Sequence, residues 1–233
     1  MSKNKLARFA DMETLANVIQ PHFSEVYQKD YRLKGKWNSD FFNCDNPLVL
    51  ELGCGKGEYT VGLASKYPGK NFIGIDIKGA RMWRGARQAI ENNLDNAGFL
   101  RTRIELADSF FAPGEIAEIW ITFPDPQLKK RRNKKRLTHP RFLNLYRKFL
   151  KNNGIIHLKT DNRILYNFTL GLVKYNGILP EIATNDLYNS YYANETHGIK
   201  TFYEQMFLDE NLPIHYLKFQ LPAEKEIINL PDE

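Results

Sequence analysis

The sequence predicts an α/β fold in which an open, mostly parallel sheet carries helices on both faces. Four short apolar runs have the β-branched and aromatic composition of strands buried on both sides, at 48–52, 72–75, 119–123 and 155–158. Helix-like stretches separate or follow them, at 58–67, 80–93, 141–151 and 165–175. A strand followed by a helix, repeated along the chain, is typical of a parallel sheet.

The composition describes a globular chain that needs no covalent cross-links. It has 233 residues, of which 42% are hydrophobic and 26% charged, which excludes intrinsic disorder over most of the length. No apolar run approaches the ~20 residues of a membrane span, and the first ten residues lack the apolar core of a secretory signal. Cys44 and Cys54 form no disulfide framework or zinc-ligand spacing. We therefore expect a cytoplasmic protein without a metal or a membrane partner.

Two parts of the chain differ in pattern. Residues 1–46 lack periodicity and are interpreted as an N-terminal arm with a short helix at 12–18, whereas 47–233 reads as a single domain. Near the end, Leu217, Phe219 and Leu221 alternate with polar residues, which predicts a half-exposed edge strand.

A glycine turn follows the first strand and precedes the first regular helix. Gly53, Gly55 and Gly57 can adopt positive φ and allow a ligand to approach the backbone closely. A dinucleotide fingerprint needs its third glycine at position 58, which is Glu58. Glu51 and Glu58 flank the turn and would repel a pyrophosphate, but not a cationic sulfonium ligand. A nicotinamide-dependent oxidoreductase is therefore disfavoured.

Asp76 ends the second predicted strand. An acidic residue at this place can accept hydrogen bonds from both ribose hydroxyls of a nucleoside ligand. The alternative is a cap for the helix whose segment starts at Lys78. The distance from the glycine turn favours the ribose interpretation.

Positive charge is concentrated in one segment. Ten of the 33 basic residues lie between 129 and 148, where there is no Asp or Glu, so the rest of the chain is slightly acidic. A concentrated basic segment can neutralise several phosphates together, which indicates a nucleic-acid partner. The alternatives are a solvated basic loop and, more weakly, a nuclear-localisation segment.

The pattern from Glu51 to Gly57, with the acid at position 76, resembles motif I and the following strand of class I S-adenosylmethionine-dependent methyltransferases. That resemblance implies a Rossmann-like, mostly parallel seven-stranded sheet and S-adenosylmethionine as methyl donor. It places Glu51 near the methionine part of the donor, with Gly53, Gly55 and Gly57 lining it.

The same resemblance implies an adenine contact from Asp108. The third strand is expected at 103–107, and Asp108 follows it; in such enzymes the acid at this place accepts a hydrogen bond from the adenine amino group. Asp108 could equally cap a turn, and Glu105 is a competing candidate.

The fourth strand ends in a Pro-Asp-Pro sequence, and the segment from Phe123 to Leu137 resembles the signature of the tRNA guanine-N7 methyltransferase family, F-P-D-P-W-P-K-K-R-H-x-K-R-R-L. Further family-like pieces lie at 34–38, 159–162 and 201–204. Gln127 and Leu128 replace the usual Trp-Pro.

The chemistry gives Asp125 a role. Guanine N7 has a free lone pair and no proton, so methyl transfer needs in-line placement rather than a general base. The product base is cationic, and a nearby carboxylate can stabilise the developing charge and accept hydrogen bonds from the base. Asp125 is the candidate catalytic residue, and an ordinary Pro-Asp-Pro turn is the alternative.

The resemblance also implies substrate-binding residues outside this turn. Lys129 and Asp161 are expected to touch the RNA, and Thr201, Phe202, Tyr203 and Glu204 to close over the nucleotide. Asp161 could instead cap a helix, and Thr201 with Glu204 has the spacing of a capping box. The tyrosines at 188, 191 and 192 could stack on bases, although packing is favoured.

Together with the resemblance, these features predict a tRNA (guanine-N7)-methyltransferase. The resemblance implies that it acts at tRNA position 46, in the variable loop. The alternative is a non-catalytic RNA-binding protein on a methyltransferase-like fold. The expected partner is tRNA. No required protein partner is indicated, and monomer and homodimer remain open.

Overall fold

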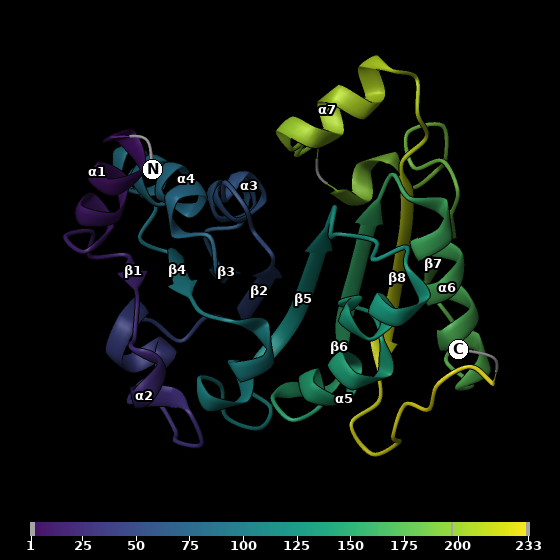
Figure 1. The fold of residues 1–233 in the computed structure, drawn as a ribbon, viewed down its shortest axis with the longest axis horizontal. Coiled ribbons are helices and arrows are strands. Elements are labelled where there is room, and N and C mark those ends of the chain that lie inside the picture. Colours follow the sequence, from purple (N-terminus) through teal and green to yellow (C-terminus); the bar gives the residue numbers. More distant parts are fainter. Residues whose placement is uncertain (1–2, 197, 232–233) are drawn as a thin grey trace.

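The computed structural model describes residues 3–196 and 198–231, which form a single eight-stranded sheet with helices on both faces (Figure 1). The strands are β1 (Val18–Ile19), β2 (Leu48–Leu52), β3 (Asn71–Asp76), β4 (Ala97–Arg101), β5 (Ile116–Thr122), β6 (Leu150–Thr160), β7 (Ile182–Thr184) and β8 (His215–Leu221). Their order is β1-β4-β3-β2-β5-β6-β8-β7, and β8 runs antiparallel to both of its neighbours. The mostly parallel sheet is confirmed, with one strand more than expected because the N-terminal arm supplies β1.

In the described part of the chain, seven α-helices pack in two groups. They are α1 (Lys3–Met12), α2 (Phe23–Val26), α3 (Glu58–Lys66), α4 (Gly79–Glu91), α5 (Pro140–Tyr146), α6 (Arg163–Tyr175) and α7 (Phe202–Asp209). One apolar cluster joins the sheet to α2, α5 and α6, and the other joins it to α1, α3, α4 and α7. Among the described residues, no helix is both long and apolar enough to cross a bilayer.

The order of the strands creates a ligand crevice. From β2 the chain builds outward through β3 and β4, then returns to place β5 on the opposite side of β2. All five residues of β2 are buried between these neighbours. In open α/β sheets, ligands bind outside the carboxyl ends of the strands at such a reversal. The ends of β2 and β5 are therefore the place for the site.

Two predictions for the first half of the chain are wrong. The helix expected at 12–18 lies earlier, as α1, and Val18–Ile19 pairs with β4 instead. The third strand is β4, not 103–107, which lies in the 3₁₀ helix Ile104–Ser109. Gly98 concealed this strand, because glycine is rare in strand interiors. A Cβ there would lie 2.6 Å from the Phe41 ring, so the packing demands glycine.

Two predictions in the second half also need correction. The helix expected at 141–151 ends at Tyr146, and β6 begins at Leu150. The predicted edge strand at 217–221 is β8, which is interior because β7 covers its outer side. Its alternating polar residues remain partly accessible, and Lys218 forms an ion pair with Glu181 at 3.3 Å.

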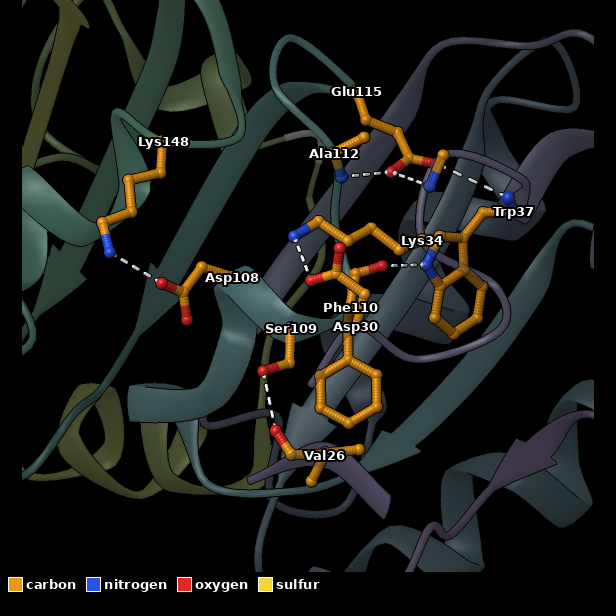
Figure 2. Close-up of polar contacts among 11 residues, drawn as sticks. Val26, Asp30, Lys34, Trp37, Asp108, Ser109, Phe110, Ala112, Glu115 and Lys148 are labelled. Atoms are coloured by element: carbon orange, nitrogen blue, oxygen red, sulfur yellow. Dashed lines mark hydrogen bonds and ion pairs between the residues drawn. The ribbon is translucent and has the colours of Figure 1, made fainter. Parts of the chain in front are cut away.

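The arm is anchored in the same core as the sheet. Trp37 is fully buried, and its Nε1 donates a hydrogen bond of 2.9 Å to the Phe110 carbonyl (Figure 2). The Glu115 carboxylate accepts hydrogen bonds from the backbone N–H groups of Gly35, Trp37 and Ala112 (Figure 2). The family-like segment at 34–38 thus fixes the arm to the loop before β5.

Candidate active site

A cleft of about 620 Å³ opens at the carboxyl ends of the central strands. Its walls include the glycine turn, the end of β3, the Pro-Asp-Pro turn after β5 and one side of α7. Its volume is in the usual range of small-molecule sites. The cleft therefore joins segments that lie up to 156 residues apart in the chain, from Glu51 to Phe207.

The glycine turn has the conformation that the sequence predicts. Gly53, Gly55 and Gly57 have φ values of +77°, +56° and +72°. A Cβ at Gly57 would lie 2.6 Å from the Phe99 ring, so this position requires glycine for packing. At Gly53 and Gly55 the nearest atom to an added Cβ would be 3.9 Å away. A Cβ there would meet its neighbours only at ordinary van der Waals distance, so the positive φ rather than crowding is what favours glycine, and the bare backbone suits a ligand that approaches it closely.

Asp76 supports the turn and also lines the cleft. One carboxylate oxygen accepts a hydrogen bond of 3.0 Å from the Gly55 N–H, and the other accepts one of 2.8 Å from the Lys78 N–H. The helix-capping interpretation is wrong, because the N-cap of α4 is Lys78 and no described side chain caps this helix; Asp76 instead holds the glycine turn and the residue before α4. Each carboxylate oxygen can accept a further bond, so the same side chain keeps the capacity to bind ribose hydroxyls.

Glu51 lies at the floor of the cleft, almost completely buried. Its carboxylate accepts hydrogen bonds from the Thr60 N–H at 2.8 Å, the Thr60 hydroxyl at 2.5 Å and the Thr122 hydroxyl at 2.8 Å. Burial raises the pKa of Glu51 to about 7, although these hydrogen bonds oppose the shift. A positively charged ligand beside Glu51 would favour its ionised form.

Asp125 is exposed and lines the cleft in a sharply defined turn. It accepts a hydrogen bond of 3.0 Å from the Gln127 N–H, and Gln127 itself has a φ of +49°. Phe123, before the turn, also has positive φ, at +47°, and donates its N–H to the Lys159 carbonyl at 2.8 Å. Positive φ at such residues is strained and persists only where the surroundings enforce it. The carboxylate is thus held in place even without the family's Trp-Pro.

Arg136 helps to hold the Pro-Asp-Pro turn in its strained conformation. Its Nε donates a hydrogen bond of 3.2 Å to the Pro126 carbonyl, and its guanidinium lies 4.4 Å from the centre of the Phe168 ring. Arg136 is 4% exposed. This residue of the basic segment therefore supports the turn rather than contacting phosphates.

The other basic residues at the start of this segment are exposed. Lys129 precedes the 3₁₀ helix Lys130–Lys135 and does not line the cleft, whereas Lys135 does. The exposed set comprises Lys129, Lys130, Arg131, Arg132, Lys134 and Lys135. Six cations beside the cleft mouth form a surface on which a phosphate backbone can lie.

Asp161 lies in the cleft wall, at the end of β6. The cap of α6 is Asn162, whose side chain accepts a hydrogen bond from the Leu165 N–H at 3.0 Å. The capping interpretation of Asp161 is therefore wrong. Burial raises its pKa above the ordinary value, so a hydrogen-bond donor on a ligand would be a favourable partner.

The segment from Thr201 to Glu204 divides between two roles. Thr201 and Tyr203 line the cleft, whereas Phe202 and Glu204 do not. The capping box is confirmed, since the Thr201 hydroxyl accepts from the Glu204 N–H at 3.2 Å while the Glu204 carboxylate accepts from the Thr201 N–H at 3.3 Å. Glu204 is fully buried in an ion pair of 2.6 Å with Lys159 and accepts a hydrogen bond from Tyr188. Glu204 thus fixes α7 to β6.

Asp108 does not line the cleft, and Figure 2 shows it beside Lys148. It lies in the 3₁₀ helix after β4, and its carboxylate forms an ion pair of 2.7 Å with Lys148. The residue after β4 that does line the cleft is Ile104. The misplaced third strand accounts for this difference, because the expected strand end lies several residues beyond the real one.

Several residues that support the site had no role assigned from the sequence, although Lys159 lies in the family-like piece at 159–162. Thr60 and Thr122 hold Glu51 from a helix and a neighbouring strand, and Lys159 holds α7 from β6. Burial lowers the pKa of Lys159, and the charge of Glu204 opposes this shift. Tyr188 contacts the Lys159–Glu204 ion pair, which agrees with the packing interpretation of this tyrosine, whereas Tyr191 is fully exposed.

Comparison with known proteins identifies the class of this fold and site. A family model described as "Putative methyltransferase" matches residues 45–217. Among solved structures, the 16S rRNA methyltransferase KamB has a TM-score of 0.62 and 13% identity, covering 84% of this chain and 95% of its own. This structural similarity shows a shared methyltransferase fold.

The particular family follows from closer relatives. The tRNA (guanine-N(7)-)-methyltransferase of Bacteroides fragilis (strain YCH46) is 52% identical over 227 residues, which is 97% of this chain and 89% of the relative. The enzyme of that name from Christiangramia forsetii is 54% identical over 221 residues, covering 94% and 99%. The chain belongs to the tRNA (guanine-N7-)-methyltransferase family.

Proposed function

We propose that this protein transfers a methyl group from S-adenosylmethionine to N7 of the guanosine at tRNA position 46, in the variable loop. The observation that carries the proposal is the meeting of Glu51, the glycine turn and Asp125 in one cleft beside six exposed basic residues. Family membership supports the class of reaction, and the cleft supports the placement of its parts.

The cleft fits the methyl donor. The turn at Gly53 and Gly55 presents bare backbone to the cleft, Asp76 retains acceptor capacity for ribose hydroxyls, and the ionised form of Glu51 would attract a positively charged ligand. When bound, S-adenosylmethionine supplies an electrophilic methyl group on a positively charged sulfur. We assign its adenine end to the segment after β4, where Ile104 lines the cleft.

The chain's own contribution to the reaction is placement and charge stabilisation. Guanine N7 attacks without losing a proton, so the site needs no general base. Asp125, held by the Gln127 N–H, presents a carboxylate to the base and stabilises the positive charge that develops on it. Asp161, Thr201 and Tyr203 are placed to orient the nucleotide in the same cleft.

The exposed basic segment completes the substrate site. Lys129 and its neighbours would bind backbone phosphates and set the position of the tRNA without reading its sequence. Base identity would then be read within the cleft, by the carboxylates of Asp125 and Asp161.

The test is direct. Incubation with methyl-labelled S-adenosylmethionine and an unmodified tRNA transcript is expected to give 7-methylguanosine at position 46, mapped by nuclease digestion and mass spectrometry. A transcript with adenosine at that position is the matched control and should remain unlabelled. Tight tRNA binding without any methyl transfer would refute the proposal and favour a non-catalytic RNA-binding protein.

A further inference from the structure

The inference concerns the contact between the glycine turn and the start of α7. These two elements form separate walls of the cleft. The turn belongs to the end that we assign to the methyl donor, and α7 to the end assigned to the nucleotide. A physical connection between them would link the two binding events.

Such a connection exists at Glu58. Glu58 is the first residue of α3 and directly follows Gly57, the last glycine of the turn. Its carboxylate accepts a hydrogen bond of 2.9 Å from the N–H of Phe202, which is 144 residues away and is the first residue of α7. The first N–H groups of a helix lack intrahelical partners, and a negative charge there also interacts favourably with the helix dipole. Glu58 therefore acts as a second cap of α7, beside Thr201.

Two further contacts join the same elements. The Lys56 ammonium, within the glycine turn, lies 3.9 Å from the centre of the Phe202 ring. On α3, a Cβ added at Gly62 would lie 2.8 Å from the Ile199 side chain, so α3 packs closely against the segment that leads into α7. Cation–π and packing contacts of this kind add to the cap.

The placement of α7 depends on such contacts. The helix has eight residues, too few to be stable by itself. The buried Lys159–Glu204 pair fixes it to β6, whereas Glu58 and Lys56 fix its first residue to the glycine turn. The cap and the helix line the cleft with Thr201, Tyr203 and Phe207, and the first two of these flank Phe202. The position of these two residues thus follows the position of Glu58.

We propose that Glu58 is a positioning residue that couples binding of the methyl donor at the glycine turn to placement of α7 over the nucleotide. The proposal rests on the proposed function, because it assigns the two ends of the cleft to donor and RNA. Coupling of this kind is reciprocal: each ligand raises the affinity for the other by the same factor. Glu58 also lines the cleft, and we assign its effect to the hydrogen bond with Phe202 and so to α7 rather than to a contact with the reacting groups.

The experiment measures the dissociation constant of the tRNA transcript with and without S-adenosylhomocysteine, which occupies the donor site without reaction. In the wild type we expect tRNA to bind at least about fivefold more tightly with S-adenosylhomocysteine present. Glu58→Ala should reduce this factor to near one, because the loss of one cap is equivalent to about a fivefold change. Glu58→Gln keeps an acceptor oxygen at the same reach and should retain part of the coupling.

The matched control is Gln205→Ala, which removes the hydrogen bond of 2.8 Å from Gln205 to Asp209 on α7 without touching the glycine turn. It should weaken tRNA binding equally with and without S-adenosylhomocysteine. If Glu58→Ala behaved in the same way as this control, Glu58 would only stabilise α7, and the inference would be wrong. Wild-type methylation of the same transcript, measured in parallel, separates this outcome from failure of the proposed function.

Discussion

The pKa of Glu51 gives the most quantitative prediction for methyl-donor binding. Burial raises this pKa from 4.5 to about 7. One unit corresponds to 1.36 kcal/mol, so the folded protein disfavours the ionised form of Glu51 by about 3 kcal/mol. Because the folded-state pKa lies above the unfolded value, the free energy of unfolding should decrease as the pH rises from about 4.5 to about 7, and the full cost applies above that range.

A cationic donor beside Glu51 should reverse this preference, since it binds best when the carboxylate is ionised. Below the pKa, the affinity should therefore fall about tenfold for each pH unit, or about 30-fold between the plateau and about pH 5.5. The perturbation is Glu51→Gln, which keeps the size and one acceptor oxygen but cannot ionise. The variant should bind S-adenosylmethionine more weakly at neutral pH, with little dependence on pH.

Isothermal titration calorimetry of S-adenosylmethionine into both proteins, at about pH 5.5, 6.5 and 7.5, measures this difference. Circular dichroism and urea unfolding at each pH verify that both proteins remain folded. A wild-type dissociation constant that does not change with pH would refute the argument. The same would follow if Glu51→Gln retained the wild-type slope, because another group would then be titrating.

Three further predictions follow from the remaining contacts. Asp125→Asn should lower single-turnover methyl transfer about 10²- to 10³-fold while the dissociation constant of S-adenosylmethionine stays within about twofold; wild-type turnover would remove Asp125 from the catalytic role. Lys159→Met leaves the buried Glu204 carboxylate unpaired and should lower the free energy of unfolding in urea by about 3–5 kcal/mol, so an unchanged midpoint would contradict the buried pair. For tRNA binding, the logarithm of the binding constant falls linearly with the logarithm of the salt concentration, and Lys134→Ala should reduce the magnitude of this slope by about one. Arg136→Ala, in contrast, should mainly destabilise the fold. An unchanged slope in Lys134→Ala would show that Lys134 does not contact the RNA backbone.

Local patterns carried much of the fold. Strands buried on both faces must be almost wholly apolar, which is why β2, β3 and β5 are visible as short runs in the sequence. Strand β4 was not predicted, because Gly98 weakens its strand pattern. Glycine is required there by packing against the ring of Phe41, which is distant in the sequence. The same error displaced the expected strand end, and Asp108 pairs with Lys148 instead of facing the cleft.

The local geometry of the candidate site was predictable where a residue's conformation follows from its immediate neighbours. The glycines of the turn and the proline-flanked Asp125 are examples, because their backbone conformations depend on local sequence. Glu58 shows the opposite case. From its position in the sequence, Glu58 could only be expected to repel a pyrophosphate. Its hydrogen bond to the Phe202 N–H could not be predicted, because Phe202 lies 144 residues away.

The sequence by itself determined the alternation of strands and helices, the glycine turn, the carboxylate between prolines and the location of the basic segment, since each depends on residues close in the chain. Only the tertiary structure decided which residues share the cleft. In the folded protein Arg136 and Glu204 are buried in other contacts and do not line the cleft, and Glu58 is hydrogen-bonded to α7. The physical reason is that burial and hydrogen bonding between distant segments depend on how the strands are ordered in the sheet, and strand order is a property of the whole chain.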